Sequence, residues 1–267
     1  MKHTAPHFSI ITVVRNAAET IESCLASVRS QTVDLEHIVV DGCSTDGTLE
    51  RLQRHAATGT IDLSSGRDNG IYDAMNKGLR RARGDIVGIL NADDFYAHPH
   101  ILARIDAAFA TPEIDAVYSD LVYANGDDTS NVVRYWRSGP YSPRAFLSGW
   151  MPPHPTFFVR RSVYERCGMF RTDLGSAADY ELMLRFLFKH RIAAAYVPEV
   201  AVVMRTGGVS NQSWKHRMKA NRMDRRAWAV NGLRPRPWTL TLKPVRKLGQ
   251  YVASLRPGID LQPPATN

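Results

Sequence analysis

Cysteine is scarce in this sequence, and its positions exclude two kinds of stabilising site. Only Cys24, Cys43 and Cys167 occur among 267 residues. Their odd number and wide spacing support neither a disulfide framework nor a zinc site built from close cysteine pairs. This cysteine usage suits a reducing compartment, so we expect the protein in the cytoplasm.

Long apolar runs are missing as well. The longest one near the N-terminus, Phe8–Val14, is interrupted by Arg15. It is too short for the apolar core of a secretory signal and far short of a membrane span. We therefore expect no segment to cross a bilayer.

Two glycine-rich phosphate-binding motifs are absent. The segment after the first apolar run, residues 14–18, reads Val-Arg-Asn-Ala-Ala and lacks the glycines of a dinucleotide-binding fingerprint, and no P-loop occurs. A nucleotide site in this chain must therefore use other groups, such as carboxylates with a metal ion.

The apolar pattern indicates an α/β domain, because buried strands alternate with amphipathic helices, which is typical of a parallel sheet. The predicted strands are 8–14, 37–40, 60–63 and 85–90, and the predicted helices are 17–29, 45–55, 71–83 and 98–110. After residue 110 the pattern changes. The segments 116–123 and 132–136 flank a polar turn at 125–128 and predict a β-hairpin.

Adjacent acids end the fourth predicted strand, where the chain reads Asn91-Ala92-Asp93-Asp94. Two carboxylates at the mouth of a buried strand destabilise each other's ionised forms unless a cation or hydrogen-bond donors compensate. Oxygen ligands favour Mg²⁺ or Mn²⁺, which bridge a substrate diphosphate through one or two carboxylates. A structural alternative is that Asp93 or Asp94 caps the helix predicted at 98–110.

Two further acids, Asp41 and Asp68, follow the second and third predicted strands. Ligands of open α/β sheets bind at the carboxyl ends of the strands. Acids after three successive strands therefore predict one shared ligand site. Taken alone, Asp41 is equally well explained as a turn or cap residue.

At this point the sequence resembles family 2 glycosyltransferases of the GT-A fold. The similar segments, in the family's order and spacing, are Phe8–Val14, Val40–Thr48, Asp68–Gly78 and Asn91–Asp94. The resemblance covers about residues 8–205, and Asp68–Gly78 is particularly similar to bacterial transferases that build extracellular polysaccharides or glycolipids. It implies a mostly parallel sheet flanked by helices, and the transfer of a sugar from a nucleotide-diphospho-sugar to a hydroxyl acceptor.

The resemblance also implies a role for each acid. Asp41 would contact the base of the donor, Asp68 would contact its nucleoside, and Asp93 would be the metal-binding acid of the Asp-x-Asp motif. Asn91 stands where the first aspartate of that motif is expected. Its amide can hydrogen-bond a ribose hydroxyl but is a weaker metal ligand. The implied cofactor is Mn²⁺ or Mg²⁺, and the implied donor is a UDP-sugar by default, with a GDP-sugar as the alternative.

Two more side chains are candidates to complete the metal's coordination shell together with the donor phosphates. One is Asp94, and the other is His154, which Pro153 and Pro155 fix just before a predicted strand. His154 is alternatively a contact to the diphosphate or to the acceptor. A structural role is the open alternative for this lone histidine.

Inversion at a sugar carbon requires a base that takes the proton of the acceptor hydroxyl. The resemblance implies that this base is Asp179, in the segment 175–185. Without the resemblance, Asp179 would be interpreted as the N-cap of a helix at 180–189. Glu181 is the alternative base and a candidate contact to the acceptor or the diphosphate, although its spacing to Arg185 also suits a helical ion pair.

The last quarter of the chain is strongly basic. Residues 201–267 hold 13 lysine or arginine residues and 2 acidic residues, whereas the whole chain has a formal net charge of +8. Trp214, Met218 and Trp228 alternate with basic side chains, which suits a helix on an anionic membrane surface. A helix packed on the catalytic domain is the open alternative. Basic patches also attract nucleic acids, but no nucleic-acid-binding motif is present, so we expect no such partner.

These observations divide the chain into a tail at 1–7, a GT-A domain at 8–205, a basic amphipathic extension at 206–256 and a flexible tail at 257–267. Within the domain, 8–110 forms the nucleotide-sugar-binding half and 111–205 the acceptor and catalytic half. The expected protein is a metal-dependent glycosyltransferase of polysaccharide or glycolipid synthesis, peripheral on the inner face of the cell membrane, with a lipid-linked acceptor. The alternatives are a nucleotidyltransferase that makes an activated sugar and a non-catalytic binding protein of the same fold.

Overall fold

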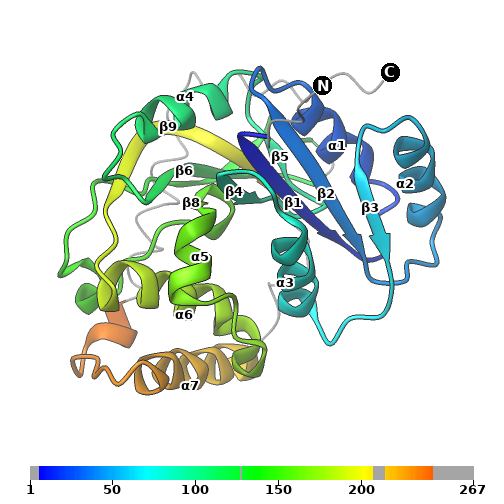
Figure 1. Cartoon of the computed structure of the whole chain (residues 1–267). Coiled ribbons are helices and arrows are strands. Elements are labelled where there is room, and N and C mark those ends of the chain that lie inside the picture. The colour runs from blue at the N-terminus through cyan, green and yellow to red at the C-terminus, as the bar shows by residue number, and fades with distance from the viewer. Residues whose placement is uncertain (1–5, 127, 207–213, 243–267) are drawn as a thin grey trace.

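The computed structural model describes residues 6–126, 128–206 and 214–242, and for 214–221 the main chain alone. Its strands are β1 (Phe8–Val14), β2 (Leu35–Asp41), β3 (Asp62–Ser65), β4 (Ile86–Ile89), β5 (Phe95–Tyr96), β6 (Ala116–Ala124), β7 (Val132–Trp136), β8 (Phe158–Arg160) and β9 (Ala194–Arg205). Together they form one curved sheet (Figure 1).

The helices lie between and after these strands. They are α1 (Ile21–Arg29), α2 (Thr48–Ala57), α3 (Ile71–Arg81), α4 (Ile101–Phe109), α5 (Arg161–Cys167), α6 (Ala178–Met183) and α7 (Trp214–Val230). Four shorter helical turns complete the described part: η1 (Ala145–Ser148), η2 (His154–Thr156), η3 (Thr172–Ala177) and η4 (Leu184–Lys189).

The sheet has the strand order β3-β2-β1-β4-β8-β6-β9-β5, with β7 paired to β6. The strands β1, β2, β3 and β4 are parallel, as the alternating pattern predicts. The second half is mixed, because β8 is antiparallel to both β4 and β6, and β9 is parallel to β6 but antiparallel to β5. The predicted α/β class is confirmed, and most of the paired residues of the sheet lie in parallel ladders, although the antiparallel pairs of β5, β7 and β8 make the second half mixed. The predicted hairpin is present as β6 and β7, whose short connection permits only antiparallel pairing.

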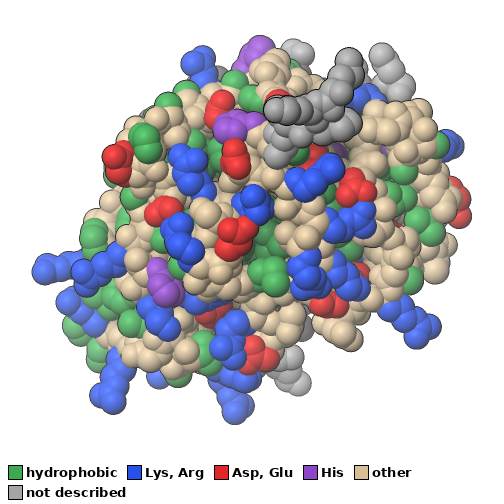
Figure 2. Space-filling view, viewed as in Figure 1, with side chains coloured by type: hydrophobic (Ala, Val, Ile, Leu, Met, Phe, Trp, Pro, Cys, Tyr) green, Lys and Arg blue, Asp and Glu red, His purple; other side chains and the backbone are tan. Residues whose placement is uncertain are grey.

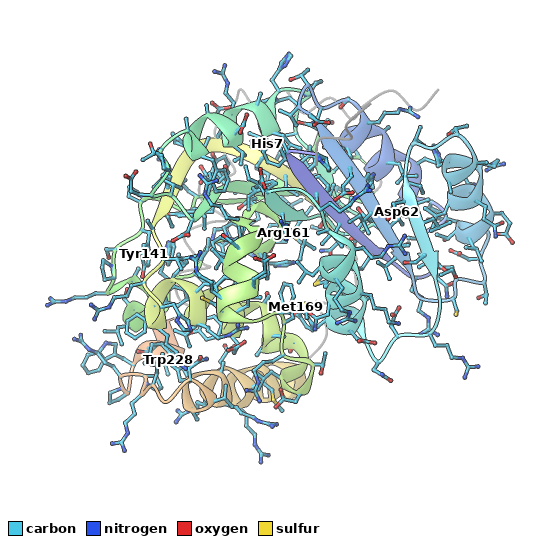
Figure 3. The ribbon with its side chains drawn as sticks, viewed as in Figure 1. His7, Asp62, Tyr141, Arg161, Met169 and Trp228 are labelled. Carbon is cyan, nitrogen blue, oxygen red and sulfur yellow. The ribbon has the colours of Figure 1, made fainter. Side chains whose placement is uncertain are left out.

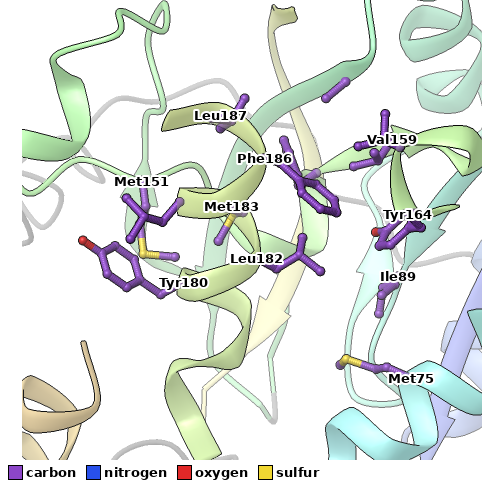
Figure 4. Close-up of a cluster of buried hydrophobic side chains, with 14 of the residues drawn as sticks. Met75, Ile89, Met151, Val159, Tyr164, Tyr180, Leu182, Met183, Phe186 and Leu187 are labelled. Atoms are coloured by element: carbon purple, nitrogen blue, oxygen red, sulfur yellow. The ribbon is translucent and has the colours of Figure 1, made fainter. Parts of the chain in front are cut away.

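Each face of the sheet carries its own hydrophobic core. Along β1, Ile11 and Val13 point to the face covered by α3, α5 and α6, whereas Phe8 and Ile10 point to the face covered by α1, α2 and α4. Figure 4 shows part of the first core, between α3, α6 and the sheet. Burying a large apolar side chain stabilises a fold by about 1.5–3 kcal/mol. Both faces of the central strands are therefore buried and mainly apolar, and the exposed polar groups lie at the strand ends.

Gly78 explains how closely α3 approaches the sheet. A Cβ atom at this position would lie 2.4 Å from Cγ2 of Ile11 on β1, which is closer than side chains can pack. Two residues earlier on α3, Asn76 exchanges hydrogen bonds with the main chain of Phe170, at 3.0 Å from the N–H and 2.9 Å to the carbonyl. The segment Asp68–Gly78 thus joins the two halves of the domain.

Helix boundaries differ from the prediction by a few residues for local reasons. The first helix begins at Ile21 instead of residue 17, because residues 17–20 form a turn in which the N–H of Thr20 bonds to the carbonyl of Ala17. The helix predicted at 180–189 is α6 followed by the π-helical turn η4. The short elements β5 and α5 and the long strand β9 were not predicted.

The C-terminal helix α7 packs on the catalytic domain. It lies along the lower edge of the molecule in Figure 1, beside α6 and η3. Trp228 is fully buried where α7 meets the domain (Figure 3), and its indole N–H donates to the Tyr180 hydroxyl at 2.9 Å. The idea that Trp228 inserts into a membrane is therefore wrong. Within the described residues, no helix is both long and apolar enough to span a bilayer.

Several predicted features fall wholly or partly outside the described residues. The side chains of Trp214 and Met218, the end of the predicted extension at 243–256 and the predicted tail at 257–267 belong to this group.

Candidate active site

The two acids predicted to contact the nucleoside lie together at the ends of β2 and β3. A Cβ atom built on Gly42, the residue after Asp41, would lie only 3.1 Å from Oδ2 of Asp68. The other carboxylate oxygen of Asp68 accepts a hydrogen bond from Nζ of Lys77 on α3. Glycine at position 42 therefore leaves the Asp68 carboxylate room beside the strand end.

Asp41 is fully buried and already has partners. Its carboxylate accepts the N–H of Ser44 at 3.2 Å and the hydroxyl of Ser65 at 2.6 Å. Asp41 thus ties the loop after β2 to the end of β3. A contact from its carboxylate to a nucleotide base requires this corner to open.

The acid pair after β4 forms a tight turn. The N–H of Asp94 donates to the carbonyl of Asn91 at 3.1 Å. In this turn Asn91 and Asp93 are partly exposed, whereas Ala92 and Asp94 are buried. The alternative that either acid caps the next helix is wrong, because α4 begins at Ile101 and its N-cap is His100.

Asp94 faces the protein interior and is fully buried. Its Oδ2 accepts the Asn91 amide at 3.3 Å, and its Oδ1 has no partner among the described residues. Burial, and to a lesser degree the neighbouring charge of Asp93, raise the pKa of this carboxyl well above its ordinary value. Asp94 thus differs from its neighbour Asp93, which is partly exposed.

The predicted base meets the predicted histidine. Oδ2 of Asp179 lies 3.5 Å from Nδ1 of His154, and both side chains are partly exposed. Burial lowers the pKa of His154, while the charges of Asp179 and Asp93 act in the opposite direction. His154 therefore lies next to Asp179 and within range of the charge of Asp93.

Tyr72, on the first turn of α3, also borders the base. Burial raises the pKa of its phenol, and the carboxylate of Asp179 adds to the rise. The Tyr72 ring packs 5.5 Å from that of Phe170. This residue belongs to a motif that the sequence singled out, but no pattern in the sequence indicated that its side chain reaches Asp179.

Glu181 points away from this site. Its side chain is 1% exposed and pairs with Nε of Arg185 at 2.9 Å, in the i,i+4 arrangement that the spacing allowed. Asn231, just after α7, donates to the same carboxylate at 2.9 Å. The prediction that Glu181 contacts the acceptor is therefore contradicted. Asp179 is not a helix cap either, because α6 begins at Ala178 and its N-cap is Ala177.

The protein offers a divalent ion few ligands of its own. Within the described ranges, no three histidine, cysteine, aspartate or glutamate side chains gather into a metal cluster. Asp93 nevertheless suits an ion held mainly by a substrate, since Mg²⁺ and Mn²⁺ commonly bind through one or two carboxylates together with phosphate oxygens and water. The charge of Asp93 also acts on the imidazole of His154. The residues present therefore fit a donor-bridging ion.

The fold and this arrangement of acids define the class of protein as a glycosyltransferase with the GT-A fold. The sequence model of Glycosyl transferase family 2 matches residues 9–168, which include every predicted site residue except Asp179 and Glu181. The chain belongs to that family.

One relative and two solved structures illustrate the similarity. The PGL/p-HBAD biosynthesis glycosyltransferase of Mycobacterium bovis is 32% identical over 211 residues, which is 78% of this chain and 80% of the relative. The mannosyltransferase PcManGT from Pyrobaculum calidifontis, solved with GDP-Man and Mn²⁺, has a TM-score of 0.61 at 23% identity, over 95% of this chain and 75% of that one. A fragment of S. aureus TarS bound to UDP has a TM-score of 0.59 at 18% identity, over 93% and 80%. These structures share the fold.

Proposed function

We propose that this glycosyltransferase transfers a sugar, with inversion, from a UDP- or GDP-linked donor to a hydroxyl group of a lipid-linked acceptor, in glycolipid or polysaccharide synthesis. The observation that carries the proposal is the meeting of Asp179 with His154 at 3.5 Å, within the electrostatic reach of Asp93. In this proposal His154 links Asp93, from the nucleotide half of the domain, with Asp179, from the acceptor half.

In this proposal the donor lies over the ends of β2, β3 and β4. Asp68 contacts the nucleoside, and Asp41 shapes the corner that receives the base. Asn91 reaches a ribose hydroxyl, and the carboxylate of Asp93 holds the divalent ion. When bound, Mn²⁺ or Mg²⁺ stabilises the negative charge of the departing diphosphate.

Asp179 acts on the other side of the sugar. Its carboxylate takes the proton of the acceptor hydroxyl while that oxygen bonds to the anomeric carbon. The bond from the anomeric carbon to the diphosphate oxygen breaks, and the electron pair leaves with the nucleoside diphosphate. His154 and Tyr72 hold the Asp179 carboxylate in place. Attack opposite the leaving group inverts the anomeric configuration.

Two kinds of similarity support the choice of donor and acceptor. The structures that share the fold were solved with GDP-Man or UDP, which supports a uridine or guanosine donor. The relative named for PGL biosynthesis supports a glycolipid product.

A basic surface on and after α7 supports a lipid-linked acceptor. Arg225, Arg234 and Arg236 are exposed around Trp238, which is 49% exposed, and the guanidinium of Arg236 lies 5.7 Å from the centre of the Trp238 ring. Figure 2 shows basic side chains projecting from the lower edge, where α7 lies in Figure 1. Exposed tryptophan with arginine suits the headgroup region of an anionic bilayer. In this proposal, Trp238 replaces Trp228 as the membrane contact, on the cytoplasmic face of the membrane.

The donor is tested by thermal shift with nucleoside diphosphates, each with and without MnCl₂. We expect UDP or GDP to raise the melting temperature only with the metal, and Asp93→Asn to lose that rise. Stabilisation by no nucleotide would contradict the proposed donor site. Assays with a panel of activated sugars then separate the alternatives. Transfer releases a nucleoside diphosphate, a nucleotidyltransferase releases pyrophosphate from a triphosphate, and a binding protein releases neither.

The membrane contact is tested by sedimentation with vesicles. We expect binding to phosphatidylglycerol vesicles, little binding to phosphatidylcholine, and a loss at high salt. Arg236→Gln should weaken partitioning about fivefold, since one basic residue near an anionic surface contributes about 1 kcal/mol. The matched control is Arg54→Gln on α2, whose arginine is also exposed. Equal loss in both variants, or no preference for anionic vesicles, would refute the contact.

A further inference from the structure

Arg205, the last residue of β9, reaches the turn that carries Asp93. Its Nη1 donates to the main-chain carbonyl of Asp93 at 2.7 Å, and its Nη2 donates to the hydroxyl of Ser23 on α1 at 2.9 Å. The guanidinium carbon also lies 4.9 Å from the centre of the Phe95 ring. One side chain therefore links β9, α1 and the turn after β4.

The register of the sheet brings Arg205 to this position. The antiparallel pair β5 and β9 matches Phe95 with Val203 and Tyr96 with Val202. Continued two residues before the start of β5, the same register would set Asp93 opposite Arg205. Main-chain pairing thus brings the end of β9 close to the turn that carries Asp93, and the Arg205 side chain completes the contact.

The turn itself leaves little else to orient Asp93. Two contacts between Asn91 and Asp94 close it, one through the main chain at 3.1 Å and one through the side chains at 3.3 Å. Ala92 and Asp94 are buried, so Asp93 emerges between two anchored neighbours. The carbonyl that Arg205 holds belongs to the same residue whose carboxylate is proposed to hold the ion.

Charge gives Arg205 a second effect. Burial lowers its pKa, and the charges of Asp94 and Asp93 oppose that shift, as expected for a cation held among carboxylates. A guanidinium keeps its proton under all ordinary conditions. Arg205 therefore supplies positive charge to a turn with two adjacent acids, where an ion would otherwise be the main compensation.

We propose that Arg205 is a positioning residue for the divalent ion, because it fixes the Asp93 peptide and so holds the Asp93 carboxylate in the orientation that binds the metal. The inference rests on the proposed metal-binding role of Asp93. Hydrogen-bonded residues behind metal ligands typically contribute 10- to 100-fold in metal affinity or activity.

Two substitutions separate geometry from charge. Arg205→Met removes the donors and the charge but keeps much of the side-chain volume. Arg205→Lys keeps the charge but cannot hold the Asp93 carbonyl and the Ser23 hydroxyl together. We expect Arg205→Met to weaken Mn²⁺ binding by about tenfold or more, and Arg205→Lys by an intermediate factor.

Each protein is titrated with MnCl₂ in the presence of saturating UDP or GDP. The electron paramagnetic resonance signal of free Mn²⁺ measures how much of the metal stays unbound. Kinetic assays add a second readout. Excess Mn²⁺ should restore much of the kcat lost in the Arg205 variants, whereas damage to the fold would not be rescued by the metal.

Arg160→Met is the matched control. Arg160 also donates to two main-chain carbonyls, those of Ile114 at 2.8 Å and Phe109 at 2.9 Å, and its guanidinium carbon lies 5.2 Å from the centre of the Phe109 ring. We expect Arg160→Met to lower the free energy of unfolding about as much as Arg205→Met does, and to leave the Mn²⁺ affinity unchanged.

The possible results are distinguishable. A Mn²⁺ affinity within twofold of the wild type in Arg205→Met, or an equal loss in Arg160→Met, would overturn the role of Arg205 while leaving the metal site intact. If the wild type with nucleotide bound no Mn²⁺, the proposed role of Asp93 would be wrong, and the inference about Arg205 would fall with it.

Discussion

Asp179 and His154 face each other at 3.5 Å, although one lies on α6 and the other on η2. The Asp93 charge acts on the same imidazole. Burial lowers the pKa of His154, and the charges of Asp179 and Asp93 oppose that shift. The imidazole is therefore the side chain through which the two acids are linked in this site.

Asp179→Asn should abolish most of the transfer while leaving donor binding intact. The amide keeps the shape of the carboxylate but cannot take a proton, so we expect kcat to fall by about 10²- to 10⁴-fold. Release of nucleoside diphosphate in the presence of acceptor measures kcat, and the metal-dependent thermal shift measures donor binding. Near-normal turnover in this variant would mean that another group is the base.

Tyr72→Phe should lower kcat more than it changes KM for the donor. The variant keeps the ring that packs on Phe170 and loses the hydroxyl that borders Asp179. Hydrogen bonds to charged groups contribute about 1.5–3 kcal/mol, so a loss of about tenfold or more is expected. The control is Tyr141→Phe, whose hydroxyl donates at 2.9 Å to the carbonyl of Leu187. Similar losses in both variants would mean that the Tyr72 hydroxyl has no specific role at Asp179.

Glu181→Ala should destabilise the fold strongly without removing a catalytic group. It leaves Arg185 buried without its carboxylate, a change that costs about 3–5 kcal/mol. The exposed pair of Arg161 and Glu165 has the same i,i+4 spacing, so Glu165→Ala is the control and should cost less than about 1 kcal/mol. Urea unfolding measures both. A cost for Glu181→Ala no larger than the control would show that the pair is not structural.

Because His37 is buried, the free energy of unfolding should fall in mild acid. Burial lowers the pKa of this histidine to about 3, and its Nε2 lies 2.9 Å from the Thr12 hydroxyl. The folded state holds the neutral ring, so its contribution is complete above the unfolded pKa of about 6.5 and is lost as the pH falls towards 3. Between pH 7.5 and 5.0, about 2 kcal/mol of unfolding free energy should disappear through this group.

Urea unfolding of the wild type and of His37→Gln at both pH values measures that effect. The glutamine variant should lose less stability on acidification, by about the same 2 kcal/mol. Identical pH dependence in the two proteins would mean that His37 titrates freely in the folded state.

The sequence by itself determined the nucleotide half of the fold. Apolar runs such as Phe8–Val14 bury both faces and must form inner strands, and parallel strands bring their carboxyl ends to one edge. The acids Asp41, Asp68 and Asp93 follow such strands, so their gathering at that edge was predictable. The family resemblance added Asp179, which local pattern alone would have interpreted as a helix cap.

Only the tertiary structure decided which of these side chains can act. Adjacent acids look alike in sequence, yet the turn at 91–94 exposes Asp93 and buries Asp94. Glu181 and Asp179 are two residues apart on one helix, and helical geometry directs one to Arg185 and the other to His154. Trp228 is buried because α7 folds back on α6.

Contacts between distant segments were the least predictable part. Arg205 meets Asp93 only because β9 pairs with β5, and the sequence separation of 112 residues carries no local signal. Local patterns are set by the period of a helix or strand and by the residues that begin and end it. Long-range pairing is set by how whole elements pack, and packing alone gave Asp179 a histidine and a tyrosine as neighbours and gave Asp93 an arginine.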